Sequence, residues 1–327
     1  MITLRLDSQT FKADDPIGAL KNVFFPHITA RMEEFKKGNF RFVHYTSSEN
    51  LIEIVKTKEL WLRTTRLMND YHEIERGIAA VTNYFSDNSN AACKEFWEIL
   101  DACHSGIQEE IKSVYISSLE DLRANTFMAS LSAHYDREDF TGRLSMWRAY
   151  APKNGVALIL NPEVFYREEN RIDVLSYPAL YWSDHEIKHN FDSLTVGITN
   201  KKNIIETTER MVVVNIIVEL FTSFAICLKH PGFEEELELR LVFRPTKQTK
   251  NAVKKSIEII GTAPQIVYKV PLEKRYGTAL DDLVNRVIIG PSSAVFEMKT
   301  ALTEILADAG ITDPNNKLYF SEIPLRT

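Results

Sequence analysis

Apolar residues follow two spacings along this chain, one typical of helices and one typical of strands. A helical spacing within residues 15–37 predicts a leading helix, and the aromatic and β-branched run at 40–45 predicts a strand. The residues Thr46-Ser47-Ser48-Glu49 have the spacing of a capping box, so a second helix is expected to begin there. Residues 60–64 look like another short strand, which makes strand, helix, strand the predicted opening unit.

Helical and strand patterns alternate through the rest of the chain without an internal repeat. The predicted helices cover residues 70–119 with a break at 86–90, 144–151, 201–228 and 293–309. The predicted strands cover residues 126–132, 156–160, 172–182, 236–243, 287–291 and 318–323. We therefore predict an α+β fold, with residues 1–39 as an N-terminal helical extension and residues 40–327 as a single α+β domain.

Composition narrows the class of protein. The 327 residues include 39 Lys and Arg against 45 Asp and Glu, a formal net charge of -6, so no overall attraction to nucleic acid or anionic lipid is expected. The amino terminus lacks the pattern of a secretory signal, and polar residues interrupt the most apolar stretch, 211–228, which we interpret as a buried helix rather than a membrane span. Three cysteines without a C-x-x-C pair fit a reducing compartment, so we expect a cytoplasmic protein without membrane partners. These are Cys93, Cys103 and Cys227.

Several familiar catalytic motifs are missing from the sequence. It contains no G-x-G-x-x-G after a strand, no Walker loop, no G-x-S-x-G elbow and no H-E-x-x-H. Candidate chemistry must therefore come from polar residues at the ends of strands. The first such group is His44-Tyr45-Thr46, at the end of a strand and before a capped helix, which suits an imidazole or hydroxyl that bonds a ligand. A half-buried strand histidine beside a capping threonine is the ordinary explanation.

The segment from Asn69 to Glu73, which follows Arg63 across a short loop, forms the second group. Asn69 and Asp70 favour turns and caps because their side chains bond nearby backbone, and this local role is the simpler interpretation. With His44 they could also form a metal site, but Asp70, His72 and Glu73 lie too close together for a familiar ligand spacing. We therefore predict no metal.

The third group lies in the strand predicted at 236–243. With the strand period of two, Glu236, Glu238 and Arg240 share one face, and the leucines between them share the other. Charged alternation usually marks a solvated face. Neighbouring carboxylates on one face repel, however, and such pairs commonly bind a cation, a ribose or a guanidinium, so a site remains an open alternative.

Two further groups are weaker. Trp147 and Tyr150 lie three residues apart on one helical face, as core aromatics often do. A basic run from Arg244 to Lys255 has no acid within it, and it is either a solvated loop or a phosphate contact.

These segments together resemble a bacterial family catalogued as domain of unknown function 2971. The resemblance extends from about residue 40 to the end of the chain, and the order of its short motifs is its most specific feature. The matching motifs are His44 to Ser47, Glu49 to Leu51, Leu60-Trp61, Asn69 to Glu73, Met146 to Ala151 with Gly155, Lys229, Glu236 to Arg240, Ile288 to Pro291 and Ser321 to Arg326.

The order of parts is also similar to that of ADP-ribosyltransferases, in which a strand-end His is followed by a second strand and a late strand carries Glu-x-Glu. This resemblance implies a core of split sheets, mixed or antiparallel and flanked by helices, with NAD as substrate. It implies that Glu238 or Glu236 is the catalytic carboxylate and that His44 acts at the same site. The implied cofactor-binding residues are His44, Tyr45, Thr46, Arg63, Asn69, Asp70, Trp147, Tyr150, Lys229 and Arg240.

The expected function is therefore an NAD-consuming enzyme, either an ADP-ribosyltransferase or an NAD glycohydrolase. By analogy it would be a toxin or anti-phage effector, with a protein or nucleic-acid acceptor and a regulatory or antitoxin partner. Two alternatives stay open: a non-catalytic sensor that binds a nucleotide or a phage component, and a metal-dependent nuclease built on His44, Asp70 and the late glutamates.

Overall fold

The computed structural model describes residues 16–25, 30, 37, 40–67, 74–166, 174–245 and 252–324. The chain divides into two compact units, each assembled from segments that are far apart in the sequence. The first unit comprises Met1–Glu34, Thr64–Thr126 and Tyr177–Glu234. The second comprises Phe35–Arg63, Phe127–Ser176 and Glu235–Thr327.

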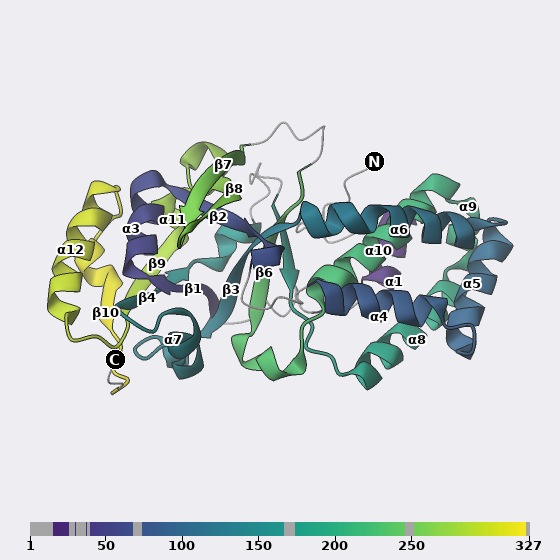
Figure 1. Cartoon of the computed structure of the whole chain (residues 1–327), viewed down its shortest axis with the longest axis horizontal. Helices are drawn as coiled ribbons and strands as arrows, with labels where there is room; N and C mark the ends of the chain where they lie inside the picture. Colours follow the sequence, from purple (N-terminus) through teal and green to yellow (C-terminus); the bar gives the residue numbers. More distant parts are fainter. Residues whose placement is uncertain are drawn as a thin grey trace. The chain divides into compact units, whose positions relative to one another are not determined.

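Helices build the first unit (Figure 1). The apolar helix α10 packs against α4 and α6, and α5 packs against α8. By length and composition α10 could cross a membrane, but 67% of it is buried inside the protein, as expected for a core helix. The helices of this unit are α1 (Pro16–Phe24), α4 (Glu75–Ser86), α5 (Ala91–Cys103), α6 (Ile107–Ala124), α8 (Asp184–Asn200), α9 (Lys202–Thr207) and α10 (Arg210–Cys227).

Helix boundaries differ from the sequence prediction at three places. The region predicted as two helices, 70–119, contains three, because the chain turns again at Gly106, whose φ of 75° is left-handed. The single helix predicted at 201–228 is broken after Thr207, since Thr208 and Glu209 are extended. The hydroxyls of Thr207 and Thr208 bond carbonyls one turn back and so compete with continued helix. Helix α8 was not predicted.

The second unit is an open sheet flanked by helices. Along the sheet the strand order is β10-β9-β4-β1-β3-β2-β8-β7, and β6 also pairs with β3. Strands β9 and β10 are parallel while β1 is antiparallel to β3 and β4, so the sheet is mixed and the predicted α+β class is confirmed. The strands of the chain are β1 (Phe40–Ser47), β2 (Glu59–Thr64), β3 (Phe127–Tyr135), β4 (Gly155–Leu160), β5 (Leu175–Pro178), β6 (Glu238–Phe243), β7 (Lys254–Ile260), β8 (Ala263–Pro271), β9 (Val284–Ile289) and β10 (Leu318–Phe320).

Helices cover both sides of strands β1, β4 and β9, with α7 on one side and α3 and α12 on the other (Figure 1). Helix α3 begins at the cap Ser47, whose hydroxyl accepts from the Asn50 N–H, and not at Thr46 as the predicted capping box required. It ends at Lys58, which has a left-handed φ of 53°. The helices of this unit are α3 (Ser48–Thr57), α7 (Leu144–Tyr150), α11 (Leu280–Leu283) and α12 (Val295–Asp308). The 3₁₀ helices of the chain are η1 (Thr65–Leu67), η2 (Asp136–Glu138), η3 (Pro162–Tyr166), η4 (Pro231–Glu236), η5 (Lys274–Tyr276) and η6 (Pro314–Lys317).

One edge of β3 is shared by two strands. Ser132 pairs with Val43 of β1 and with Glu238 of β6, so β1 and β6 lie on opposite edges of β3. Strand β6 fills its edge from Phe127 to Ser132, and β2 also pairs with β3. Strand β2 must therefore lie on the same edge of β3 as β1. Because β1 occupies that edge from Ser132 to Tyr135, β2 pairs with the earlier part of β3, and the two strands separate between these positions.

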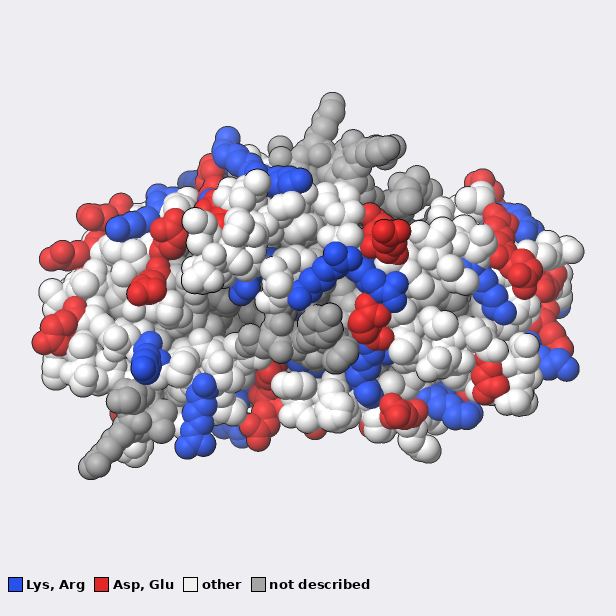
Figure 2. Space-filling view, in the orientation of Figure 1, with Lys and Arg blue, Asp and Glu red and all other residues white. Residues whose placement is uncertain are grey.

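Three strand predictions need correction. The strand predicted at 236–243 begins at Glu238, and it is buried at every position rather than half-exposed. The strand predicted at 172–182 is reduced to β5 among the described residues. Strands β7 and β8 were not predicted; Lys254 and Lys255, at the end of the basic run that we interpreted as a solvated loop or a phosphate contact, belong to β7. Figure 2 shows Lys and Arg interspersed with Asp and Glu on the face in view, in keeping with the balanced charge.

Candidate active site

The register of β3 relates the first strand to the late acidic strand. Val43, Ser132 and Glu238 lie in one row across β1, β3 and β6, and Ser130 is the partner of Arg240. Partners in a row share a face of the sheet. Ser132 Oγ lies 4.0 Å from Met146 Sδ of α7, so the face that carries Val43, Ser132 and Glu238 is the one that α7 covers. Strands in a sheet lie about 4.8 Å apart, so β1 and β6 are roughly 10 Å from each other.

His44 lies where β1 leaves the edge of β3. Its Nδ1 is 3.2 Å from the Ser130 carbonyl oxygen, and since a carbonyl only accepts, Nδ1 carries the proton. Burial lowers the pKa of His44, although the Ser130 bond opposes this, so the imidazole is neutral at pH 7. Nε2 is then an acceptor, and no described residue bonds it. Because Val43 packs against α7, strand alternation places His44 on the other face of the sheet, so the imidazole and Glu238 lie on opposite faces and the structure does not bring them together.

Glu238 and Arg240 form a buried ion pair on β6. Arg240 Nε donates to Glu238 Oε2 at 3.0 Å, and the two side chains are 0% and 2% exposed. Breaking such a pair on one side leaves an uncompensated charge in the interior. The pair therefore keeps Glu238 an ionised carboxylate in a site with little water.

Glu236 is the second buried acid, and it lies just before β6. Tyr150 of α7 donates its hydroxyl to Glu236 Oε1 at 2.6 Å. Leu237, between the two acids, has a φ of 45°, a left-handed conformation that side chains rarely adopt. Its carbonyl accepts from the Ala133 N–H at 2.9 Å. Both acids lie on the α7 side, but Glu236 precedes β6 and the left-handed Leu237 places it there, and not the regular strand alternation that we predicted.

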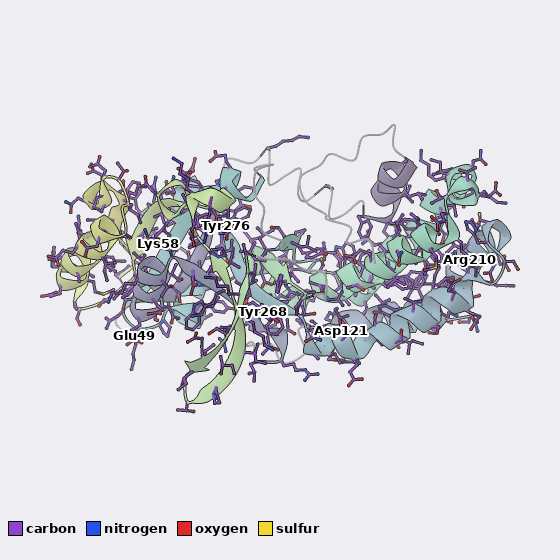
Figure 3. The ribbon with its side chains drawn as sticks, turned by 90° about the horizontal axis from the view of Figure 1, so that it is seen from above. Glu49, Lys58, Asp121, Arg210, Tyr268 and Tyr276 are labelled. Atoms are coloured by element: carbon purple, nitrogen blue, oxygen red, sulfur yellow. The ribbon has the colours of Figure 1, made fainter. Side chains whose placement is uncertain are left out.

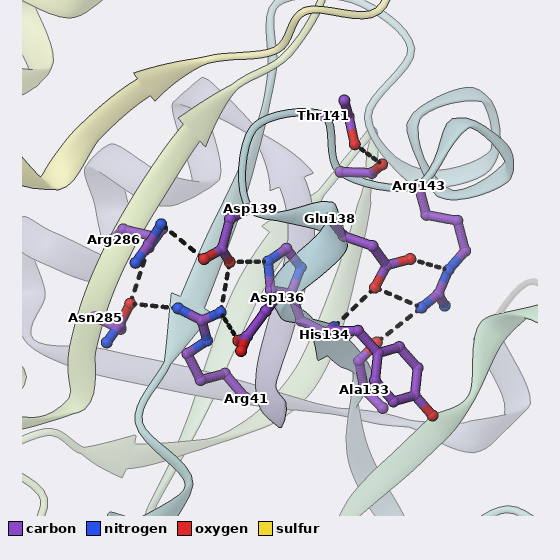
Figure 4. A network of polar contacts seen from close by, with 12 residues as sticks. Arg41, Ala133, His134, Asp136, Glu138, Asp139, Thr141, Arg143, Asn285 and Arg286 are labelled. Atoms are coloured by element: carbon purple, nitrogen blue, oxygen red, sulfur yellow. Dashed lines mark hydrogen bonds and ion pairs between the residues drawn. The ribbon is translucent and has the colours of Figure 1, made fainter. Parts of the chain in front are cut away.

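Arg143, directly before α7, holds this twisted segment in place (Figure 4). Its guanidinium makes a fork with the buried Glu138, at 2.9 and 3.1 Å, and donates to the carbonyls of Ala133 at 2.9 Å and Glu235 at 2.7 Å. Glu138 in turn accepts from the Tyr135 N–H. One side chain thus ties the end of β3 to the residue preceding Glu236.

Aromatic packing fixes the position of α7. Trp147 is fully buried in a cluster with Val43 and Tyr45, and its indole N–H donates to the Thr141 carbonyl at 2.8 Å. The rings of Tyr45 and Trp147 meet edge to face at 5.0 Å. The Tyr45 hydroxyl accepts from the Arg143 N–H at 2.8 Å, and burial raises the pKa of Tyr45 to about 12. Trp147 and Tyr45 therefore pack the core under the acids, and their predicted contact with a cofactor stays a prediction.

A second ionic group adjoins Arg143 in Figure 4. Asp139 accepts from His134 Nε2 at 2.9 Å and from Arg41 at 2.6 Å, and Arg286 lies 3.0 Å from its other oxygen. Burial alone would raise the pKa of Asp139, but the bonds from Arg41 and His134 and the charge of Arg286 outweigh it, so the pKa is lowered. This group links β1, β3 and β9 and gives the site a stiff support.

The other predicted site residues have separate surroundings. Thr46 is buried and accepts from the Asn50 amide at 3.0 Å. Arg63 of β2 lies 3.4 Å from Gln265 Oε1, and burial lowers its pKa. Lys229 belongs to the first unit, where its ammonium lies 5.2 Å from the Phe233 ring centre.

Asn69 and Asp70 lie outside the described residues. Within the described ranges, no cluster of three or more His, Cys, Asp or Glu side chains could hold a metal ion. Cys93 and Cys227 are buried free thiols and Cys103 is a half-buried one.

Sequence reasoning missed the residues that organise the site. Arg143 and Glu138 are five positions apart in a turn, where no periodicity marks them. The only local signal was the density of charge in Asp136-Arg137-Glu138-Asp139, which is also typical of a solvated turn. The left-handed Leu237 carries no signal, since glycine or asparagine is the usual residue there.

The comparison with protein families supports the family that the motifs indicated. The model described as "Protein of unknown function (DUF2971)" matches residues 146–241. The match includes Met146 to Ala151 and Glu236 to Arg240, and the motifs before 146 and after 241 lie outside it. No curated protein and no solved structure matches the chain.

Proposed function

We propose that the chain is an NAD-consuming enzyme that breaks the bond between nicotinamide and ribose. The observation that carries the proposal is the pair of buried carboxylates, Glu236 and Glu238, on either side of the left-handed Leu237. Backbone strain of this kind costs about 1–3 kcal/mol and clusters at functional sites. Burying two acids and straining the backbone both cost stability, so we interpret this segment as a functional site and not as ordinary core.

The chemistry assigns Glu238 the catalytic role. When the glycosidic bond breaks, nicotinamide leaves with the bonding electron pair and the ribose carbon becomes oxocarbenium-like. A carboxylate held ionised by Arg240 in a water-poor site stabilises that positive charge more strongly than one in water. Water or an acceptor hydroxyl then adds to the carbon and loses its proton. Glu236, fixed by Tyr150, orients the ribose or the nucleophile.

His44 lies on the opposite face of the sheet from Glu238, so the proposal assigns it no contact with the ribose at Glu238. Its neutral imidazole, with a protonated Nδ1, presents Nε2 as an acceptor on that other face. The divergence of β1 and β2 beside β3 agrees with the split sheets of an ADP-ribosyltransferase-like core. A toxin or anti-phage role, a macromolecular acceptor and an antitoxin partner follow from the same resemblance and belong to the proposal.

The test measures nicotinamide release from labelled NAD by the purified full chain. A positioned catalytic group contributes about 10²- to 10⁴-fold, so Glu238→Gln should lower the rate by at least about 100-fold. The substitution removes a charge that pairs with the buried Arg240 and lowers the melting temperature, so rates are compared at a temperature where circular dichroism shows both proteins folded. Glu235→Gln is the matched control, because that side chain is exposed and only its carbonyl is used. Release that persists at the wild-type rate in Glu238→Gln contradicts the proposal.

One observation favours a second candidate, a non-catalytic module that binds a nucleotide. Both acids already have protein partners, Arg240 for Glu238 and Tyr150 for Glu236, as purely structural acids would. Absence of nicotinamide release, together with saturable NAD binding by calorimetry that Glu238→Gln abolishes, would support this candidate instead. Metal-dependent cleavage of RNA would support the nuclease alternative.

A further inference from the structure

The sheet of the second unit ends at β7, and that edge is unusually open. Strand β7 pairs with β8 in an unbroken register from Lys254 to Ile260. Its other edge pairs with no described strand. Natural edge strands are usually protected by a proline, a bulge, shortness or charged side chains; β7 has exposed Lys254 and Lys255, but it has seven regular residues, no bulge and no proline. Within the part of the chain that the structure describes, its outward backbone groups thus face no other strand.

One face of this edge is apolar and exposed. Ile257 and Ile259 are 71% and 75% exposed, and Ile266, the partner of Ile257 on β8, is 40% exposed. All three lie on the same face because register partners and alternate residues share a face. Figure 3 shows the hairpin of β7 and β8 projecting beyond Tyr268. An apolar stripe beside an open edge is typical of an interface between chains.

The charges on the opposite face of β7 indicate what covers it. Lys254 is the register partner of Lys269, a like charge. Lys269 is already paired with Glu258 at 2.7 Å, and Lys254 makes no ion pair with any described residue. Among the described residues Lys254 therefore has no counter-charge, while Glu258 lies on the same face two positions beyond Ser256.

We propose that β7 joins two copies of this chain by antiparallel pairing centred on Ser256. In a two-fold pair of strands, residues equally distant from the centre lie opposite each other. Lys254 of each copy then faces Glu258 of the second copy, so in each half of the dimer one carboxylate is shared between Lys254 of the second copy and its own Lys269. On the other face the pairing places Ile257 beside Lys255 and joins the two apolar stripes. The ten-stranded sheet becomes continuous across the dimer.

The test is the oligomeric state of the full chain by sedimentation velocity over a range of concentrations. The wild type should form a dimer, and Ile257→Lys should be monomeric. Val196→Lys is the matched control, because Val196 is an equally exposed apolar residue of α8, at 63%, and its variant should stay dimeric. Ile259→Lys repeats the test at a second exposed position.

Charge reversal tests the register itself. Lys254→Glu or Glu258→Lys alone creates two repulsive contacts per dimer and should weaken association about tenfold. The double variant Lys254→Glu/Glu258→Lys restores opposite charges and should recover the wild-type affinity, with melting curves confirming the fold. A wild type that stays monomeric, an Ile257→Lys variant that still dimerises, or a double variant no tighter than the single ones would each overturn the proposal. This inference is independent of the NAD site.

Discussion

Replacement of Arg143 tests whether one side chain holds the acidic segment in place. Arg143→Ala removes both bonds to Glu138 and both bonds to the carbonyls of Ala133 and Glu235. Arg143→Lys keeps the positive charge but loses the planar fork, so it can satisfy only part of this set.

The magnitude follows from burial. The side chains of Arg143 and Glu138 are 15% and 11% exposed. Removal of the arginine leaves Glu138 with one remaining bond, from the Tyr135 N–H, and breaking a buried pair in this way costs about 3–5 kcal/mol. Arg143→Lys leaves one carbonyl unsatisfied and one oxygen of the fork unpaired, which costs about 2 kcal/mol at roughly 1 kcal/mol each.

Urea unfolding followed by tryptophan fluorescence and by circular dichroism measures these costs, with coincident transitions required for a two-state treatment. Arg137→Ala is the matched control, since Arg137 is an exposed arginine of the same turn and should change stability by no more than about 0.5 kcal/mol. The double variant Arg143→Ala/Glu138→Gln removes the stranded charge and should recover at least about 1 kcal/mol.

Two results would refute the reasoning. An Arg143→Ala variant that loses less than about 1 kcal/mol would show that the network is not stabilising. Strict additivity of the Arg143 and Glu138 substitutions would show that the two residues act independently.

Three further predictions follow from the surroundings of the site. Gly142→Ala should cost about 2 kcal/mol or more in urea unfolding and alter tryptophan fluorescence, because Gly142 has a φ of 67° and a Cβ there would lie 2.7 Å from the indole nitrogen of Trp147; unchanged stability and emission would contradict this. Leu237→Gly should be more stable than Leu237→Ala by about 1 kcal/mol, since both lose the side chain and only glycine relieves the left-handed strain; equal midpoints would argue against strain. The lowered pKa of His44 means that the folded state binds fewer protons than the unfolded chain, so stability is full above the ordinary value of 6.5 and falls as the pH drops below it. His44→Gln should reduce that fall in a series of unfolding curves from acid to neutral pH, and an identical slope in wild type and variant would count against a buried neutral imidazole.

Local sequence patterns were sufficient to predict a helix or strand where the residues of a segment strongly prefer one backbone conformation. The aromatic and β-branched run became β1, the apolar run at 156–160 became β4, and the amphipathic stretch after Ser292 became α12. The first two are core strands whose residues favour extended backbone. The third has apolar residues spaced for one helical face. Such preferences act between neighbours in the chain, so the sequence alone predicts them.

The sequence could not decide whether the charges of β6 face water or protein. Alternation of Glu and Arg with Leu has the same appearance in both cases, and we expected a half-exposed strand. Burial of Glu238 and Arg240 follows from the pairing of β6 with β3 beneath α7, which involves residues about one hundred positions away. That pairing depends on the packing of the whole unit.

The sequence by itself determined the fold class and the residue types available for chemistry, and residues 146–241 match one family model. Tertiary structure alone decided that Arg143 bonds the segment before Glu236, that Leu237 separates the two acids and that His44 bonds the Ser130 carbonyl of β3. The physical reason is that hydrophobic periodicity records how each residue meets its neighbours along the chain. Burial, register and ion pairing depend on which distant segments the compact core brings together. Those contacts produce no regular spacing of residues along the sequence, so the sequence alone does not predict them.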